Sequence, residues 1–269
     1  MSAGSLAFHG FLAFFPAIIA ALGVLTLVHV GPATLHHLTR GIAKALPSGA
    51  AGVFDDAVRA ARSRRSGSVV AVVVGIAVAS WSSTSAMGVL QQVLDVAYGV
   101  ETDRSFLARR LRGLPLLAAT GVLGTLAAAL VVFGQPIGAG LEGALSVRAP
   151  AFNAAWTAVR WVVAFGSISV LFSAYYAFAP NRDRARWRWV TPGSLAATGV
   201  FLLASLGFSF YVSTFGSYGK TYGSFAGVAI FIFWIYLTSL AVLAGGELNA
   251  LLEREGVLGD RPQRRGRGV

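Results

Sequence analysis

The chain has 269 residues, of which 55% are hydrophobic and 12% are charged, and it contains no cysteine. The charged share is about half that of an ordinary water-soluble domain. This composition excludes a disordered chain, a disulfide-stapled secreted domain and a cysteine-ligated metal protein, and it argues against a water-soluble enzyme, since so much apolar surface cannot all be buried. The sequence therefore predicts an integral membrane protein.

Basic residues outnumber acidic ones, with 22 Lys and Arg against 11 Asp and Glu. In a soluble protein this excess would indicate nucleic-acid binding. Here the arginines lie in the gaps between apolar runs, where membrane proteins hold their topology signals. We therefore expect membrane lipids as partners and no nucleic acid.

Six apolar runs are long enough to cross a hydrocarbon layer of about 30 Å, which takes about 20 helical residues. Continuous runs favour helices over barrel strands, which would alternate. We predict an all-α fold, a polytopic bundle of six transmembrane helices in one domain, residues 1–252, followed by a basic, disordered cytoplasmic tail, 253–269. The predicted spans are about 6–30, 69–90, 114–133, 154–178, 190–212 and 225–248.

The first run is predicted to be a retained span, because no basic residue precedes Arg40 and the run is too long for a signal peptide. The connection 31–67 contains an amphipathic helical segment. Its apolar positions recur at helical spacing, and Asp55 and Arg59 form an i,i+4 pair. Such a helix lies at the membrane surface, or it covers a central cavity as a lid. Its apolar face consists of Val53, Phe54, Ala57, Val58 and Ala61.

Orientation follows from the basic residues of the connections. The segments 94–113 and 180–189 and the tail together are richer in arginine than the alternating set of connections. This favours cytoplasmic N- and C-termini in a bacterial inner membrane. The first connection is itself rich in basic residues and argues for the opposite orientation.

A tyrosine-rich block, 211–222, separates the last two spans. The hydroxyl groups of this block line a site, or the block forms a short hairpin at the membrane interface. The candidate residues are Tyr211, Tyr218, Lys220 and Tyr222. Glycines four residues apart on one helix face predict close helix packing, although they also suit a turn that enters the bilayer. These glycines are Gly219, Gly223 and Gly227.

Ionisable groups within spans usually mark a pathway or a paired contact. Glu247 is the strongest candidate for a polar cavity or for coupling, and Arg104 and Asn249 are further candidates. Glu247 forms a structural ion pair with Arg104 or Arg112, takes part in proton or ligand coupling, or is exposed at the interface. Asp95 lies beside two glutamines, which line a polar cavity or face interfacial water.

Two further polar residues lie within the predicted spans. Arg160 reaches the head groups, or it faces inward towards an anion. His9 is expected to form a hydrogen bond with a neighbouring helix, with a proton relay as the alternative.

Several blocks of the sequence are similar to YihY/BrkB membrane proteins, once labelled ribonuclease BN. The resemblance covers nearly the whole chain and is most specific in the tyrosine-rich block and in the Gly-Glu-Leu-Asn that ends at Asn249. It implies a six-helix inner-membrane protein without a settled molecular activity. The chain departs from the family pattern at His9 and Asp95. The blocks are 6–16, 81–85, 90–99, 104–111, 186–193, 207–223, 234–236 and 246–249.

Ribonuclease activity is not expected, because none of the four histidines lies in a metal-ligand motif and no nucleotide-binding or hydrolase motif occurs. We therefore predict no catalytic residue, no metal and no cofactor. The first hypothesis is a transporter or flippase of a lipid, an envelope precursor or another amphiphilic anion. The alternative is a non-transporting membrane scaffold or envelope-integrity protein. An intramembrane enzyme is the third hypothesis, and no nucleophile–base pair supports it.

Overall fold

The computed structural model describes residues 3–14, 69–101, 104–145, 150–182, 187–214 and 224–255. All regular structure in these ranges is helical, which confirms the all-α prediction. Four of the helices are long and apolar enough to cross a membrane, and the chain is a polytopic membrane protein. The helices are an N-terminal helix (Ala3–Phe14), α4 (Val69–Tyr98), α5 (Phe106–Leu145), α6 (Pro150–Phe178), α7 (Pro192–Thr214) and α9 (Ser224–Arg254).

The helices extend beyond the predicted spans. Helix α4 continues past residue 90 to Tyr98, and α5 runs from Phe106 to Leu145 although the predicted span was 114–133. Hydropathy marks only the length that lipid must cover, whereas backbone hydrogen bonding continues through the polar ends. Helix α9 likewise continues to Arg254, two residues past the predicted start of the tail.

Several predicted features lie outside the described residues. They are the first span beyond residue 14, the amphipathic segment of 31–67, Tyr218, Gly219, Lys220, Tyr222, Gly223 and the tail from 256. Gly227 lies in the first turns of α9.

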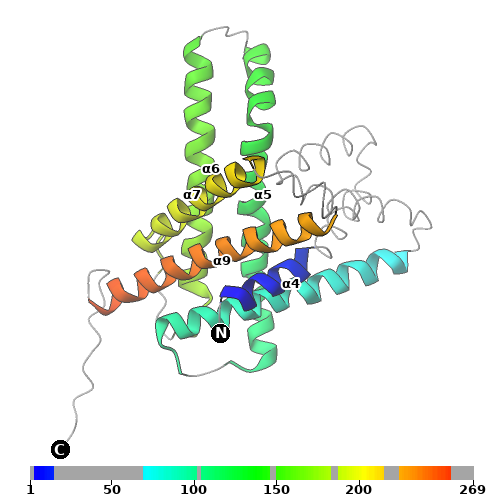
Figure 1. Cartoon of the computed structure of the whole chain (residues 1–269), viewed down its shortest axis with the longest axis vertical. Helices are drawn as coiled ribbons and strands as arrows, with labels where there is room; N and C mark the ends of the chain where they lie inside the picture. The colour runs from blue at the N-terminus through cyan, green and yellow to red at the C-terminus, as the bar shows by residue number, and fades with distance from the viewer. Residues whose placement is uncertain are drawn as a thin grey trace, which may run out of the picture.

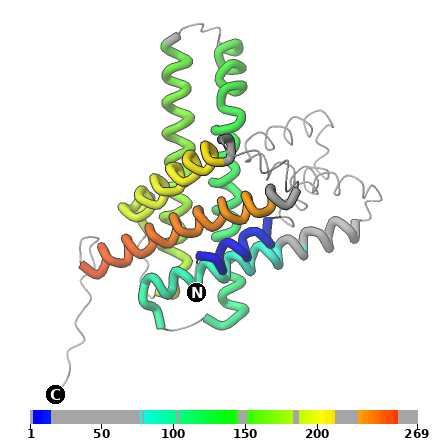
Figure 2. The backbone as a smooth tube through the Cα atoms, viewed as in Figure 1, coloured from blue at the N-terminus to red at the C-terminus, as the bar shows by residue number. Residues whose placement is uncertain are grey.

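Helices α5 and α6 form a long antiparallel hairpin, upright in Figure 1, and α4, α7 and α9 cross its lower half obliquely. Helix α7 packs mainly on α9, and α4 contacts both α5 and α9. The N-terminal helix lies alongside α9, as the tube in Figure 2 shows, and the rings of Phe14 and Phe231 lie 4.4 Å apart. The fold therefore consists of two helix pairs joined by α4 and by the packing of α6 on α7.

The outward surface is apolar. Val162 on α6 is 70% exposed, and Leu203 on α7 is 71% exposed. Large aliphatic side chains at such positions would be unfavourable in water and suit a hydrocarbon environment. The surface agrees with the membrane assignment from sequence.

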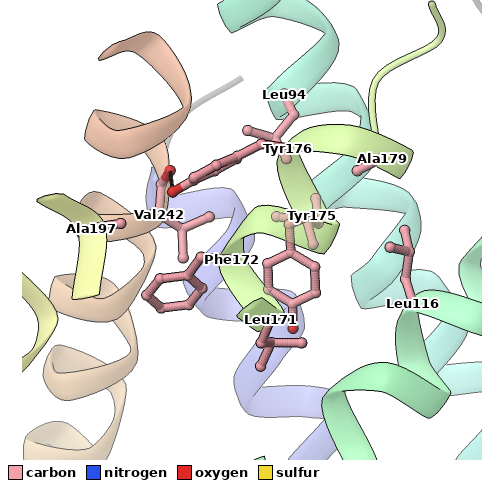
Figure 3. Close-up of a cluster of buried hydrophobic side chains, with 10 residues drawn as sticks. Leu94, Leu116, Leu171, Phe172, Tyr175, Tyr176, Ala179, Ala197 and Val242 are labelled. Carbon is pink, nitrogen blue, oxygen red and sulfur yellow. Dashed lines mark hydrogen bonds between the residues drawn. The ribbon is translucent and has the colours of Figure 1, made fainter. Parts of the chain in front are cut away.

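The buried core lies around α6 (Figure 3). Phe172, Tyr175 and Tyr176 of α6 meet Leu94 of α4 and Val242 of α9. Since lipid is as apolar as these side chains, helix association in a membrane depends on packing and on hydrogen bonds between helices. The Tyr176 hydroxyl supplies one such bond, donating to the Val242 carbonyl oxygen at 2.8 Å.

Within the described ranges, helices α7 and α9 approach each other closely at a pair of glycines. A Cβ atom on Gly193 would lie 2.2 Å from the carbonyl oxygen of Gly245, and one on Gly245 would lie 2.5 Å from the Tyr176 hydroxyl. Only residues without a side chain allow this approach. These glycines fix how the start of α7 sits on α9.

Candidate functional site

One end of the molecule holds a set of polar side chains that we call the polar cluster: Gln91, Asp95, Arg104, Asn181, Arg182 and Glu253. It lies where α4 and α9 end and where the α6–α7 connection passes between them. Gln91 is fully buried and Asp95 is 8% exposed. Both are therefore buried groups, and the interpretation of Asp95 as a residue in interfacial water is wrong.

Arg104 is the centre of the polar cluster. Its Nε donates to Asn181 Oδ1 at 3.0 Å, and Nη1 donates to Gln91 Oε1 at 2.8 Å and to the Ala179 carbonyl at 2.7 Å. Its Nη2 donates to the Pro180 carbonyl at 2.9 Å. The planar, forked guanidinium suits this set of acceptors, and a lysine could not reach all of them. Arg104 thereby joins α4, the segment before α5 and the α6–α7 connection.

The charge of Arg104 is partly balanced. Burial lowers the pKa of Arg104. The positive charges of Arg112 and Arg109 lower this pKa further, and the negative charge of Asp95 raises it. The guanidinium nevertheless stays charged in a protein. Arg104 therefore acts as a fixed charge that holds the chain and not as a proton donor.

Asp95 lies in the last turn of α4, beside the cap that ends this helix. Gly99 has φ +67°, and the N–H groups of Gly99 and Val100 donate to the carbonyls of Val96 and Asp95, which is a Schellman C-cap. The cap uses the backbone carbonyl of Asp95, and the side-chain Oδ1 of the same residue accepts a hydrogen bond from the Asn181 N–H at 2.6 Å. The bond fixes the α6–α7 connection on the end of α4.

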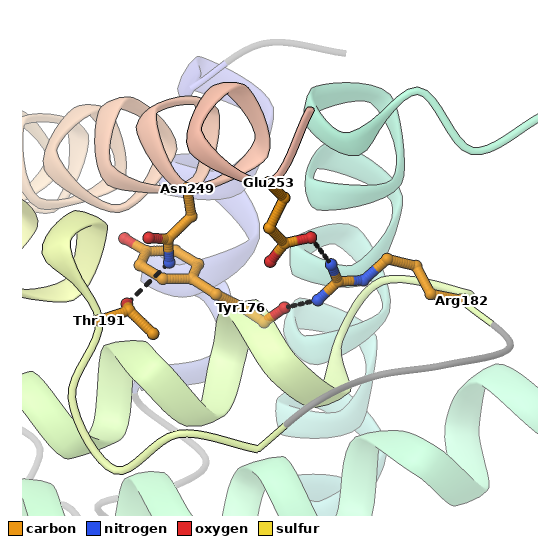
Figure 4. Close-up of polar contacts among 5 residues, drawn as sticks. All are labelled: Tyr176, Arg182, Thr191, Asn249 and Glu253. Carbon is orange, nitrogen blue, oxygen red and sulfur yellow. Dashed lines mark hydrogen bonds and ion pairs between the residues drawn. The ribbon is translucent and has the colours of Figure 1, made fainter. Parts of the chain in front are cut away.

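Arg182 forms the second link of the polar cluster (Figure 4). It makes an ion pair with Glu253 of α9, donates to the Tyr176 carbonyl at 2.6 Å, and has its guanidinium carbon 4.1 Å from the ring centroid of Tyr98. Three helices thus meet at one side chain. Glu253, which the sequence placed in a disordered tail, is instead bound into the fold.

Asn249 caps the N-terminus of α7, as Figure 4 shows in part. Its Oδ1 accepts from the Gly193 N–H at 2.9 Å, and its Nδ2 donates to Thr191 Oγ1 at 2.8 Å. Thr191 and Ser194 form reciprocal side-chain bonds to each other's backbone N–H groups, as in a capping box. Asn249 was predicted as a cavity or coupling residue, and it acts in this structure as a link between helices.

Arg110 joins two further sequence blocks. Its guanidinium donates to Thr84 Oγ1 at 3.1 Å and to Ser85 Oγ at 2.9 Å, and it lies 3.4 Å from the ring centroid of Trp81. Cation–π contact and hydrogen bonding together hold the start of α5 on α4.

Glu247 lies apart from the polar cluster, on the wall of a groove between α4 and α9. The groove has a volume of about 340 Å³. Glu247 is exposed and makes no hydrogen bond or ion pair with any described residue, so the predicted pairing with Arg104 or Arg112 is not formed. The walls are Val93, Val96, Ala97, Leu243, Glu247, Ala250, Leu251 and Arg254.

Tyr211 lines a different groove, between α7 and α9, with a volume of about 660 Å³ and with Phe208 and Phe233 on its walls. Asp95, Glu247 and Tyr211 therefore do not face one shared cavity. Gly193 and Gly245 allow a close contact between helices, and the sequence reasoning did not select them as packing glycines.

Arg160 packs on a neighbouring helix, whereas the bond of His9 stays within its own helix. Arg160 is half-buried against α5, where a Cβ on Gly134 would lie 2.8 Å from its Cδ. His9 Nδ1 lies 2.9 Å from the Ser5 carbonyl, one turn earlier in the same helix. The predicted hydrogen bond of His9 was to a neighbouring helix instead.

The described residues contain no group of three His, Asp or Glu side chains placed to hold a metal ion.

The sequence pattern of the virulence factor BrkB family matches residues 1–267. The chain belongs to the BrkB family. It is similar to the ribonuclease-like protein YfkH of Bacillus subtilis, with 34% identity over 255 residues that cover 95% of this chain and 90% of that protein.

Other BrkB relatives match over shorter stretches. A UPF0761 membrane protein of Nitrosospira multiformis is 43% identical over 84 residues, which cover 31% of this chain and 20% of that protein. A UPF0761 membrane protein of Pseudoalteromonas translucida is 38% identical over 93 residues, which cover 35% and 31%. No solved structure matches this chain.

Proposed function

We propose that this BrkB-family chain is a non-enzymatic transporter or flippase that moves an amphiphilic molecule between the two sides of a bacterial inner membrane. The observation that carries the proposal is the groove between α4 and α9. It combines aliphatic walls with the carboxylate of Glu247 and the guanidinium of Arg254. A groove of this kind suits a molecule with a polar head and an apolar body.

The arrangement of the helices also supports transport. The α7–α9 pair and the α5–α6 hairpin are connected through α4, through the packing of α6 on α7, and through the polar cluster at one end. Two helix units joined in this way can move relative to each other about that end. The polar cluster then keeps the units joined while the groove between α4 and α9 changes width.

A flux assay tests the proposal. The purified chain is reconstituted into liposomes that contain fluorescent phospholipids or a polyprenyl phosphate, and movement between leaflets is measured by quenching from outside. Glu247→Gln should reduce flux strongly, whereas Glu255→Gln, which removes an exposed carboxylate outside the groove, should not. Absence of flux across a broad panel of lipids would remove the proposal.

The orientation is part of the same proposal. Arg104, Arg182 and Arg254 gather at the end that holds the polar cluster, which the positive-inside rule assigns to the cytoplasm. Because the chain has no cysteine, single cysteines report sidedness directly. In intact cells a membrane-impermeant maleimide should label Ala144→Cys and should label Glu101→Cys only after permeabilisation. The reverse pattern would invert the topology.

A scaffold is the second candidate, and the polar cluster favours it. Asp95, Arg104 and Asn249 are all engaged in bonds that hold helices together, and they share no cavity with Glu247. A scaffold does not need the Glu247 carboxylate. It therefore predicts that Glu247→Gln restores any envelope phenotype of a deletion strain as fully as the unchanged protein, whereas a transporter predicts that it fails.

A further inference from the structure

The groove between α4 and α9 carries two opposite charges on one helix face. Glu247 and Arg254 are seven residues apart, which is nearly two full turns, so both side chains project from the same side of α9. At about 1.5 Å per residue they are separated by about 10 Å along the axis. This distance is too long for an ion pair between them, and neither forms one with another described residue.

Other charges at this end of the molecule are treated differently. Asp95 accepts a bond from the Asn181 N–H, and Glu253 pairs with Arg182. Glu247 is the carboxylate that faces a groove lined largely by Val, Leu and Ala side chains, two of which, Val96 and Leu251, are more than half exposed. Glu247 is exposed on the groove wall, so its carboxylate is accessible to a ligand that carries the opposite charge.

The chemistry of the groove defines the ligand. A carboxylate binds an ammonium group, a guanidinium binds a phosphate, and the walls between them accept apolar groups. A molecule that carries an ammonium and a phosphate on an apolar body, and that is present at this surface, is an aminophospholipid. We propose that the groove binds the head group of an aminophospholipid, with its ammonium at Glu247 and its phosphate at Arg254.

The assignment of an amphiphilic ligand to this groove rests on the proposed function. The test of the groove measures binding and does not measure flux. The full chain in detergent micelles is titrated with phosphatidylethanolamine or with phosphatidylglycerol of the same acyl chains, and tryptophan fluorescence follows thermal unfolding. Phosphatidylethanolamine should bind more tightly and raise the unfolding midpoint more. Equal effects of the two lipids on the unchanged protein would overturn the site without the need for any variant.

The variants separate the two charges. Glu247→Gln should weaken binding of phosphatidylethanolamine about tenfold, which corresponds to one charge-assisted hydrogen bond, and should leave phosphatidylglycerol binding unchanged. Arg254→Gln should weaken binding of both lipids. Glu255→Gln, on the same helix end but outside the groove, is the matched control, and an equal loss in Glu247→Gln and Glu255→Gln would also overturn the site.

Binding and flux give separable answers. Selective phosphatidylethanolamine binding without movement between leaflets would leave the site in place and remove the transport proposal. Flux that does not distinguish phosphatidylethanolamine from phosphatidylglycerol and does not depend on Glu247 would leave transport in place and remove the site.

Discussion

The Asn249 side chain on α9 caps the first turn of α7 through the backbone N–H of Gly193, which donates to Asn249 Oδ1 at 2.9 Å. Asn249 is 1% exposed, so this bond is shielded from water and lipid alike. A helix N-terminus needs acceptors for its first N–H groups, and here a different helix provides one. The start of α7 is therefore fixed to the end of α9 by a hydrogen bond as well as by packing.

Replacing Asn249 by Ala should lower the free energy of unfolding by about 2–3 kcal/mol. The substitution removes two hydrogen bonds and leaves the Gly193 N–H and the Thr191 hydroxyl without this partner in a buried place. Thermal unfolding in detergent, followed by tryptophan fluorescence, measures the loss. The control is Asn153→Ala, because Asn153 makes an exposed bond to Glu142 and should change stability by about 0.5 kcal/mol or less. Equal losses in the two variants would show that the α7 cap is not important for stability.

Gly193→Ala should be more damaging than its size suggests. Its Cβ would lie 2.2 Å from the Gly245 carbonyl oxygen and 2.6 Å from Asn249, both of which are held in place, so α7 and α9 must separate. We expect a loss of about 2–3 kcal/mol, similar to other overpacked contacts. Gly199→Ala on the same helix is the matched control, because nothing lies within 4 Å of its Cβ position. Since Ala is the better helix former, Gly199→Ala should be neutral or slightly stabilising, and a similar loss there would argue against the close crossing.

Arg104→Lys tests geometry at constant charge. The lysine ammonium cannot reach Asn181, Gln91 and two carbonyl oxygens at once, so we expect a loss of about 2 kcal/mol or more. Arg112→Lys is the control, because Arg112 is exposed and makes no hydrogen bond with a described residue. The two variants are compared by thermal unfolding in the same detergent. If Arg104→Lys is as stable as Arg112→Lys, the positive charge alone stabilises the polar cluster.

Sequence patterns predicted the helices better than their contacts. Long apolar runs are a local signal, and every described helix overlaps a predicted span. The sequence could not show that Arg104 binds elsewhere than Glu247, because the position of Arg104 depends on where the carbonyls of residues 179 and 180 lie, and these positions are set by the packing of distant helices.

The family blocks were visible in the sequence, but their pairing was not. Arg110 in one block binds Thr84 and Ser85 in a second block, and Asn249 in a third block binds Thr191 in a fourth. Each contact joins residues far apart in the chain, so no spacing rule could identify it. The glycine pair that ends at Gly246 was a usable signal for close packing, since two adjacent glycines in an apolar span weaken a helix unless another group needs the space.

The Arg182–Glu253 ion pair should contribute modestly and in a salt-dependent manner. The Arg182 side chain is 17% exposed and that of Glu253 is 36% exposed, so solvent screens part of the attraction. A double-mutant cycle with Arg182→Gln and Glu253→Gln should give a coupling free energy of about 1 kcal/mol at low ionic strength and less at high ionic strength. Arg182→Gln alone should be the more damaging change, because it also removes the bond to the Tyr176 carbonyl and the contact with the Tyr98 ring. Zero coupling at low salt would show that the pair does not join α9 to Arg182, and equal losses from the two single changes would show that the contacts of Arg182 with Tyr176 and Tyr98 add nothing.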